Sequence, residues 1–143
     1  MVAITERNNA YKALGGIILD GTQVTATGSE LNLAADVSAR TEELTTAGAN
    51  TVTTGVQSVE LNNDTTAITA TIATSVNHQG LFIAKATSEP AVGEDHTLTL
   101  TAGTFDGTNN VATFADINDA LVVYFDSAGN GTIVENVGAV ALS

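Results

Sequence analysis

Strict alternation of threonine with aliphatic residues limits the possible folds of this chain more than any other feature. In the segment 65–73, Ile68, Ala70 and Ile72 alternate with threonines, and the segment 96–102 repeats the pattern with two leucines and an alanine. Successive side chains of a β-strand point to opposite faces, so a period of two predicts strands with one buried face. Both segments are therefore expected to be strands.

Two further segments, 80–86 and 120–125, are almost continuously apolar and are expected to be central strands. Asp106-Gly107 and the segment 126–131 supply turn residues and are expected to lie in hairpin connections. Because no long helical period separates the strands, a parallel sheet is not expected. The sequence predicts a mainly β fold, either an antiparallel β-sandwich or a jelly-roll-like domain. The expected aromatic core residues are Phe82, Phe105, Phe114, Tyr124 and Phe125.

The first 50 residues have a different pattern, and we expect an N-terminal arm (1–50) followed by an antiparallel β domain (51–143). Ser29 is placed to cap a short helix through residue 35, and Ser38 to start a second one through Leu44. Helices this short are unstable alone in water and need a surface to pack on. The arm holds three of the four basic residues, so the β domain carries most of the acid excess.

The net charge of −12 argues against several kinds of partner. Only four basic residues balance 16 acidic ones, whereas binding to nucleic acid or to an anionic membrane surface needs clustered lysine and arginine. Cysteine is absent, which excludes disulfides and thiolate chemistry. Since 43% of the residues are hydrophobic and few are charged, part of the apolar surface is expected to be covered by other chains.

Two stretches resemble structural proteins of tailed bacteriophages. Residues 24–37, VTATGSELNLAADV, resemble a segment found in head-decoration, head-fibre and tail-fibre proteins. Residues 98–114, LTLTAGTFDGTNNVATF, together with 120–143, are similar to the C-terminal β domain of capsid decoration (cement) or head-fibre proteins. The resemblance implies a non-enzymatic, usually trimeric protein without catalytic residues; decoration proteins bind the outer face of the capsid. Long fibre repeats are absent, which favours a compact decoration protein.

Catalytic and metal-binding patterns are weak in this chain. His78 and His96 stand beside turn and loop residues and are expected at the surface, with a general base or a metal ligand as the alternative. Loop oxygens, among them those of Asp106 and Asp126, are possible calcium ligands, but they do not follow EF-hand spacing and Asx turns explain them more simply. We therefore expect no enzymatic activity, no cofactor and no bound metal.

The leading hypothesis is a virion protein, made in the host bacterial cytoplasm, that decorates and cements the outer capsid surface. Its expected partners are the major capsid protein of the same phage and further copies of itself in a homotrimer, without nucleic acid or membrane. The alternative is a phage fibre-tip or receptor- or glycan-binding β domain, and a third interpretation is an enzyme on a β scaffold.

Attachment to the capsid or to other subunits is assigned to apolar residues of the arm, because they follow no clear strand or helix period and need cover from water. Packing of the arm on its own β domain is the alternative. The residues assigned to this interface are Val2, Ile4, Tyr11, Leu14, Ile17, Ile18 and Leu19.

Overall fold

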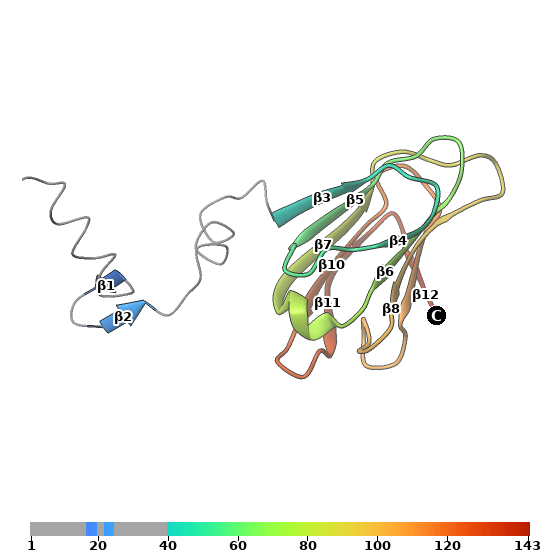
Figure 1. Ribbon diagram of the computed structural model, residues 1–143. Coiled ribbons are helices and arrows are strands. Elements are labelled where there is room, and N and C mark those ends of the chain that lie inside the picture. Colours follow the sequence, from blue (N-terminus) through green and yellow to red (C-terminus); the bar gives the residue numbers. More distant parts are fainter. Residues whose placement is uncertain (1–16, 20–21, 25–39) are drawn as a thin grey trace, which may run out of the picture. The chain divides into compact units, whose positions relative to one another are not determined.

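The computed structural model describes residues 17–19, 22–24 and 40–143 (Figure 1). The chain divides into two compact units, Met1–Asp36 and Val37–Ser143. In the first unit, β1 (Ile17–Leu19) pairs antiparallel with β2 (Thr22–Val24), so three residues of the expected interface belong to a small hairpin. The helix expected at 30–35 lies outside the described residues.

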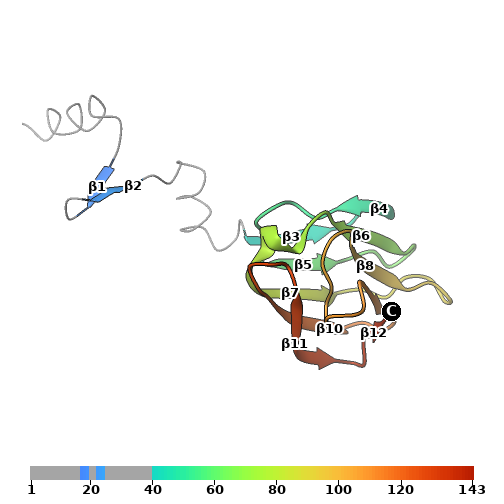
Figure 2. The ribbon, with the colours of Figure 1, turned by 90° about the horizontal axis from the view of Figure 1, so that it is seen from below.

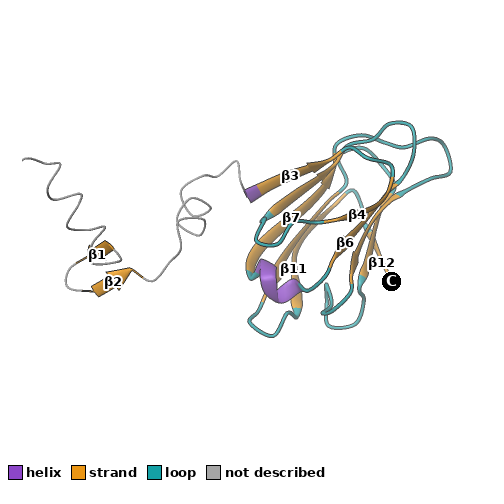
Figure 3. Ribbon diagram, in the orientation of Figure 1, coloured by secondary structure: helices purple, strands orange, loops and turns teal. Residues whose placement is uncertain are grey.

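The second unit contains two five-stranded sheets that enclose a single hydrophobic core (Figures 1 and 3). Sheet I consists of β3 (Thr41–Leu44), β5 (Ser58–Leu61), β7 (Gly80–Ala86), β10 (Ala120–Phe125) and β11 (Gly131–Val137), in the order β11-β10-β7-β5-β3. Sheet II consists of β4 (Gly48–Thr51), β6 (Ile68–Ile72), β8 (His96–Leu100), β9 (Val111–Phe114) and β12 (Ala141–Leu142), in the order β12-β9-β8-β6-β4. The expected mainly β architecture is confirmed, and it is consistent with a sandwich.

The strand directions differ from the expected antiparallel arrangement. From β3 to β8 successive strands alternate between the sheets, so β3, β5 and β7 run parallel in sheet I and β4, β6 and β8 run parallel in sheet II. The remaining neighbours in each sheet pair antiparallel. Parallel neighbours need a crossover, which is usually a helix, but here it is a strand of the opposite sheet. No helical period marks such a crossover in the sequence, and both sheets are mixed.

The strands predicted from alternation and from continuous apolar runs are confirmed as β6, β7, β8 and β10. The inward residues of β6 are the expected Ile68, Ala70 and Ile72, all with no exposed surface. The segment 126–131 connects the antiparallel strands β10 and β11, and Asp106-Gly107 lies in the connection between the antiparallel strands β8 and β9. Both expected hairpin connections are therefore present.

The second arm helix, expected from Ser38 through Leu44, is wrong because residues 41–44 form strand β3. Leu44 enters the core, while the carboxylate of Glu42 accepts hydrogen bonds from the backbone N–H and hydroxyl of Thr53. The Glu43 carboxylate accepts another from the side-chain amide of Asn62, 2.5 Å away. Glu42 and Glu43, whose position after Ser38 is typical of a helix start, thus accept hydrogen bonds from neighbouring loops instead. The first strand of each sheet begins before residue 51.

Four phenylalanines form the aromatic part of the core, as expected. The Phe125 ring lies 5.9 Å from the Phe82 ring and 6.4 Å from the Phe105 ring, centroid to centroid, and Phe114 is also fully buried. Tyr124 does not belong to this core, since its side chain is 53% exposed. It stands between two buried residues of β10 and therefore points to the outer face of sheet I.

The strand directions give the second unit two ends with different loops (Figures 1 and 2). The entry end, where the chain enters β3, carries the loop 52–57, the 3-10 helix η2 (Ser75–His78), the loop 101–110 and the turn 126–131. There the backbone N–H of Gln57 donates to the carbonyl of Arg40. The acidic end carries the loops 45–47, 62–67, 87–95, 115–119 and 138–140.

Candidate interaction surfaces

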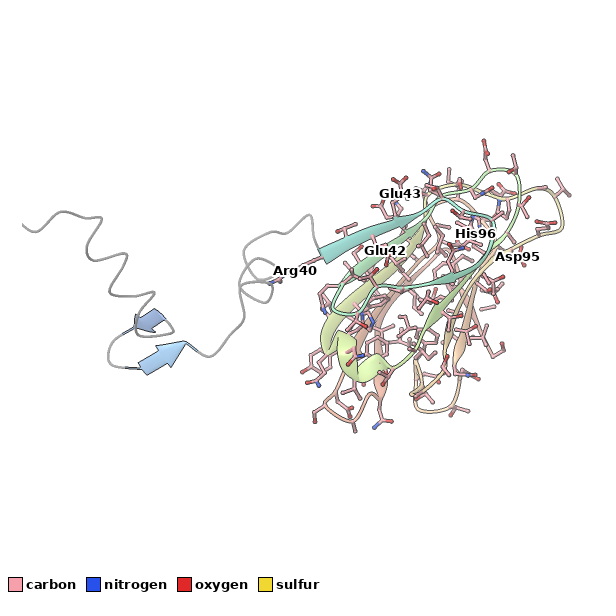
Figure 4. The ribbon with its side chains drawn as sticks, in the orientation of Figure 1. Arg40, Glu42, Glu43, Asp95 and His96 are labelled. Atoms are coloured by element: carbon pink, nitrogen blue, oxygen red, sulfur yellow. The ribbon has the colours of Figure 1, made fainter. Side chains whose placement is uncertain are left out.

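Exposed carboxylates concentrate on the loops of the acidic end. Five exposed acids lie there among the described residues, whereas the loops of the entry end carry only two, Asp106 and Asp126. Arg40 and Asp95 mark the two opposite ends in Figure 4. The five acids are Asp64, Glu89, Glu94, Asp95 and Asp116. The second unit is thus electrostatically polar along its strand direction.

The two entry-end carboxylates stabilise their own turns. Asp106 accepts backbone hydrogen bonds from Asn109 and Thr108, at 2.7 and 3.0 Å, and Asp126 accepts them from Ala128 and Asn130. These bonds, above all those from Asn109 and Asn130, hold the pKa values of Asp106 and Asp126 below the ordinary 3.8. In the part of the chain that is described, no group of three or more acidic or histidine side chains is placed to hold a metal ion.

Ser75 joins three segments at the entry end. Its hydroxyl contacts the carbonyl oxygens of Gly129, at 2.5 Å, and Ala102, at 3.2 Å, so η2 is tied to the turn 126–131 and the loop 101–110. A side chain at Gly103 would collide with the same hydroxyl, since its Cβ would overlap Ser75 Oγ. The segments of the entry end therefore pack against one another and are joined by hydrogen bonds.

Both histidines are buried, and the expectation that they lie at the surface is wrong. His96 has no exposed surface, and its Nδ1 accepts the backbone N–H of Ile68 at 3.0 Å, which fixes the proton of the neutral ring on Nε2. Burial lowers the pKa of His96, while the Ser88 backbone and the charge of Asp95 only partly oppose this. The Nδ1 atom of His78 lies 2.7 Å from the carbonyl oxygen of Val56. Because a carbonyl oxygen only accepts, this hydrogen bond requires the proton on Nδ1.

Hydroxyl groups cover the outer face of sheet II, which we call the threonine face. Thr69, Thr97 and Thr113 occupy one register row across β6, β8 and β9. A second row holds Thr51, Thr71 and Thr99 on β4, β6 and β8. None of the five strands of sheet II carries an Asp, Glu, Lys or Arg residue, so this face is uncharged.

Apolar side chains cover part of the outer face of sheet I. Leu81 and Tyr124 stand directly opposite each other on β7 and β10 and are 50% and 53% exposed. Ile83 and Val122 form the next outward-facing pair along the same two strands. Val137 on β11 stands opposite Ala120 on β10. We call Leu81, Ile83, Val122, Tyr124 and Val137 the apolar patch. Val134, 59% exposed, adjoins it at the β11 bulge.

The sequence offered one signal for this patch. Segments 80–86 and 120–125 are central strands as expected, but in a two-layer arrangement only one face of such a strand is covered by the core. The continuous apolar pattern therefore leaves every second residue on the outer surface. The residues expected to form the interface lie elsewhere: Ile17, Ile18 and Leu19 form β1, and Val2, Ile4, Tyr11 and Leu14 lie outside the described residues.

No protein-family model and no curated protein matches this chain. Among the described residues, no helix has the length and apolar character needed to cross a membrane.

Proposed function

We propose that this chain is a non-enzymatic virion protein of a tailed bacteriophage that binds and stabilises the outer surface of the capsid. The observation that carries the proposal is the polarity of the second unit. The chain enters this unit at an end that holds only turn-capping carboxylates, while five exposed acids lie at the opposite end. This arrangement suits a decoration protein, because one end would approach a shell and the other would face solvent and neighbouring particles.

The resemblance of residues 24–37, 98–114 and 120–143 to phage decoration and head-fibre proteins supports the same function. Its partners are the major capsid protein of that phage and other copies of the chain in a homotrimer. Cementing requires only adhesion across subunit seams, so the protein needs neither a catalytic group nor a cofactor.

A receptor- or glycan-binding role at a fibre tip is the second candidate, and the threonine face is the observation that favours it. Its hydroxyl rows offer donors and acceptors to a sugar, but no aromatic side chain stands among them as a stacking platform. Electron microscopy of intact particles labelled for this protein separates the two functions, since label on the shell supports decoration and label confined to the tail supports the alternative.

Deletion of residues 2–21 tests how the protein attaches to the capsid. Because the second unit has its own core, the truncated protein is expected to stay folded by circular dichroism and to lose binding to undecorated capsids of the same phage. The full chain in the same sedimentation assay is the control. Undiminished binding of the truncated protein would show that the attachment surface lies in the second unit.

A further inference from the structure

We infer that copies of this chain associate through the apolar patch around a rotation axis, with Lys85 of each copy opposite Glu135 of the next. The inference deepens the self-association in the proposed function and does not depend on capsid binding. It assigns to the outer face of sheet I a role that the arm residues were expected to fill.

The patch has the composition of an interface centre. Tyr124 and Leu81 form its most exposed pair, and the half-buried pair of Ile83 and Val122 lies next to them. Aromatic and aliphatic side chains in the middle of a contact supply most of the binding free energy, because their burial removes apolar surface from water. Their position on central strands β7 and β10 holds them rigidly, so little conformational entropy is lost on binding.

Electrostatics indicates which partner fits the patch. Residues 40–143 contain 12 acidic and two basic residues, so two copies repel each other over most of their surfaces. None of the five patch residues is acidic; Lys85 on β7 and Glu135 on β11 stand on its two sides, with Glu60 of β5 beside Lys85. A second copy of the chain supplies the complementary charge for both borders at once.

The strand order determines how Lys85 of one copy and Glu135 of the next come together. Strands β7 and β11 flank β10 on its two sides, and Lys85 and Glu135 lie one register row apart on the outer face. When patches face an axis that runs parallel to the strands, the β7 border of one copy meets the β11 border of the next. Every seam of a two-fold or three-fold ring then brings Lys85 beside Val137 of the next copy, one register row from its Glu135, a step that the long, flexible lysine side chain can span. Within its own chain Lys85 stands beside Glu60, so in the ring it lies between two carboxylates.

Sedimentation equilibrium of the purified full chain, without capsids, tests this interface. Tyr124→Ser, Lys85→Glu and Glu135→Lys are each expected to weaken association by about tenfold or more, while the double variant Lys85→Glu with Glu135→Lys regains most of it. Thr97→Lys on the threonine face is the matched control and leaves association unchanged. Thermal unfolding of each variant verifies folding, and if Lys85→Glu does not fold beside Glu60, Tyr124→Ser and Glu135→Lys carry the test.

A monomeric wild-type chain would overturn the inference, and so would single variants that associate like the wild type or a double variant that does not recover. If the patch variants stay associated but lose binding to undecorated capsids, the patch belongs to the shell contact and the inference fails while the proposed function stands. Loss of association with capsid binding retained supports the interface.

Discussion

Two adjacent residues after β11 have left-handed backbone conformations, which differ in their conformational free energy. Ala139 has φ 66° although its Cβ disfavours that region, and Gly138 has φ 77° with Asp119 packed against it. The side chain of Asn136 closes this corner by bonding both the N–H and the carbonyl of Val140, at 2.8 and 2.9 Å. The corner carries the chain from sheet I back to sheet II.

Substitutions at this corner are expected to act in opposite directions. Ala139→Gly relieves the strained backbone and should raise the free energy of unfolding by about 0.5–1 kcal/mol. Gly138→Ala places a Cβ where it overlaps Asp119 Oδ1 and should lower the free energy of unfolding by about 2 kcal/mol or more. Urea unfolding of both variants measures the difference, and a stabilising Gly138→Ala would contradict this account of the corner.

His96 makes the stability of the protein depend on pH. Its folded pKa lies below 6.5, so below that pH the unfolded state binds more protons and the free energy of unfolding falls, by at most about 1.4 kcal/mol per pH unit. The lowered pKa values of Asp106 and Asp126 matter only below 3.8, outside this window. Urea unfolding between about pH 7 and pH 5 is expected to show the loss.

His96→Asn separates this titration from packing. The asparagine carbonyl oxygen can accept the Ile68 N–H in place of Nδ1, but it does not titrate. The variant is expected to be less stable than the wild type at pH 7, because it leaves part of the buried site empty, and to have a flatter pH dependence. An equal pH dependence in both proteins would assign the effect to other groups.

At the scale of elements, Ser75 holds the entry end together. Ser75→Ala removes the hydroxyl that bonds Gly129 and Ala102 and leaves the Gly129 carbonyl without that donor, so the free energy of unfolding is expected to fall by about 1–2 kcal/mol. Ser127→Ala, at an exposed turn position, is the control and should change stability by less than about 0.5 kcal/mol. Equal effects of the two substitutions would contradict the role of Ser75.

The sequence predicted the strands whose side chains alternate or form continuous apolar runs, because burial of one face imposes that pattern directly. The antiparallel direction that it predicted is wrong for the neighbours among β3 to β8, since alternation is the same in parallel and antiparallel pairs and the direction depends on loops that cross between sheets. The strand β3 looked like a helix start because Glu42 and Glu43 follow Ser38, yet their partners, Thr53 and Asn62, are distant in sequence.

Burial of single residues was equally hard to predict. His78 and His96 have polar, turn-like neighbours, but each ring turns inward to a backbone group of a distant segment. Tyr124 lies in a continuous apolar run, where the sequence does not distinguish the inner from the outer face. The hairpin of β1 and β2 has a local signal in the sequence, because Asp-Gly, the pair at positions 20 and 21 between the two strands, is a typical two-residue turn sequence.

At the scale of the whole molecule, stability is expected to be independent of divalent metal. The carboxylates of Asp106 and Asp126 accept hydrogen bonds from their own turns, so these turns do not need a cation to neutralise them. Addition of EDTA should change the melting temperature by less than about 1 °C. A fall of several degrees that calcium reverses would reveal a site that contributes to folding.

The alternation of strands between the two sheets also sets the order in which the molecule can assemble. A hairpin such as β10 and β11 closes within microseconds, because its partners are neighbours along the chain. By contrast, pairing of β3 with β5, or of β5 with β7, closes a longer loop that contains a strand of the other sheet, so these contacts are expected to form more slowly. During synthesis, β3 and β4 thus each stay unpaired until two further strands have been made, and their apolar faces are exposed to aggregation for that time.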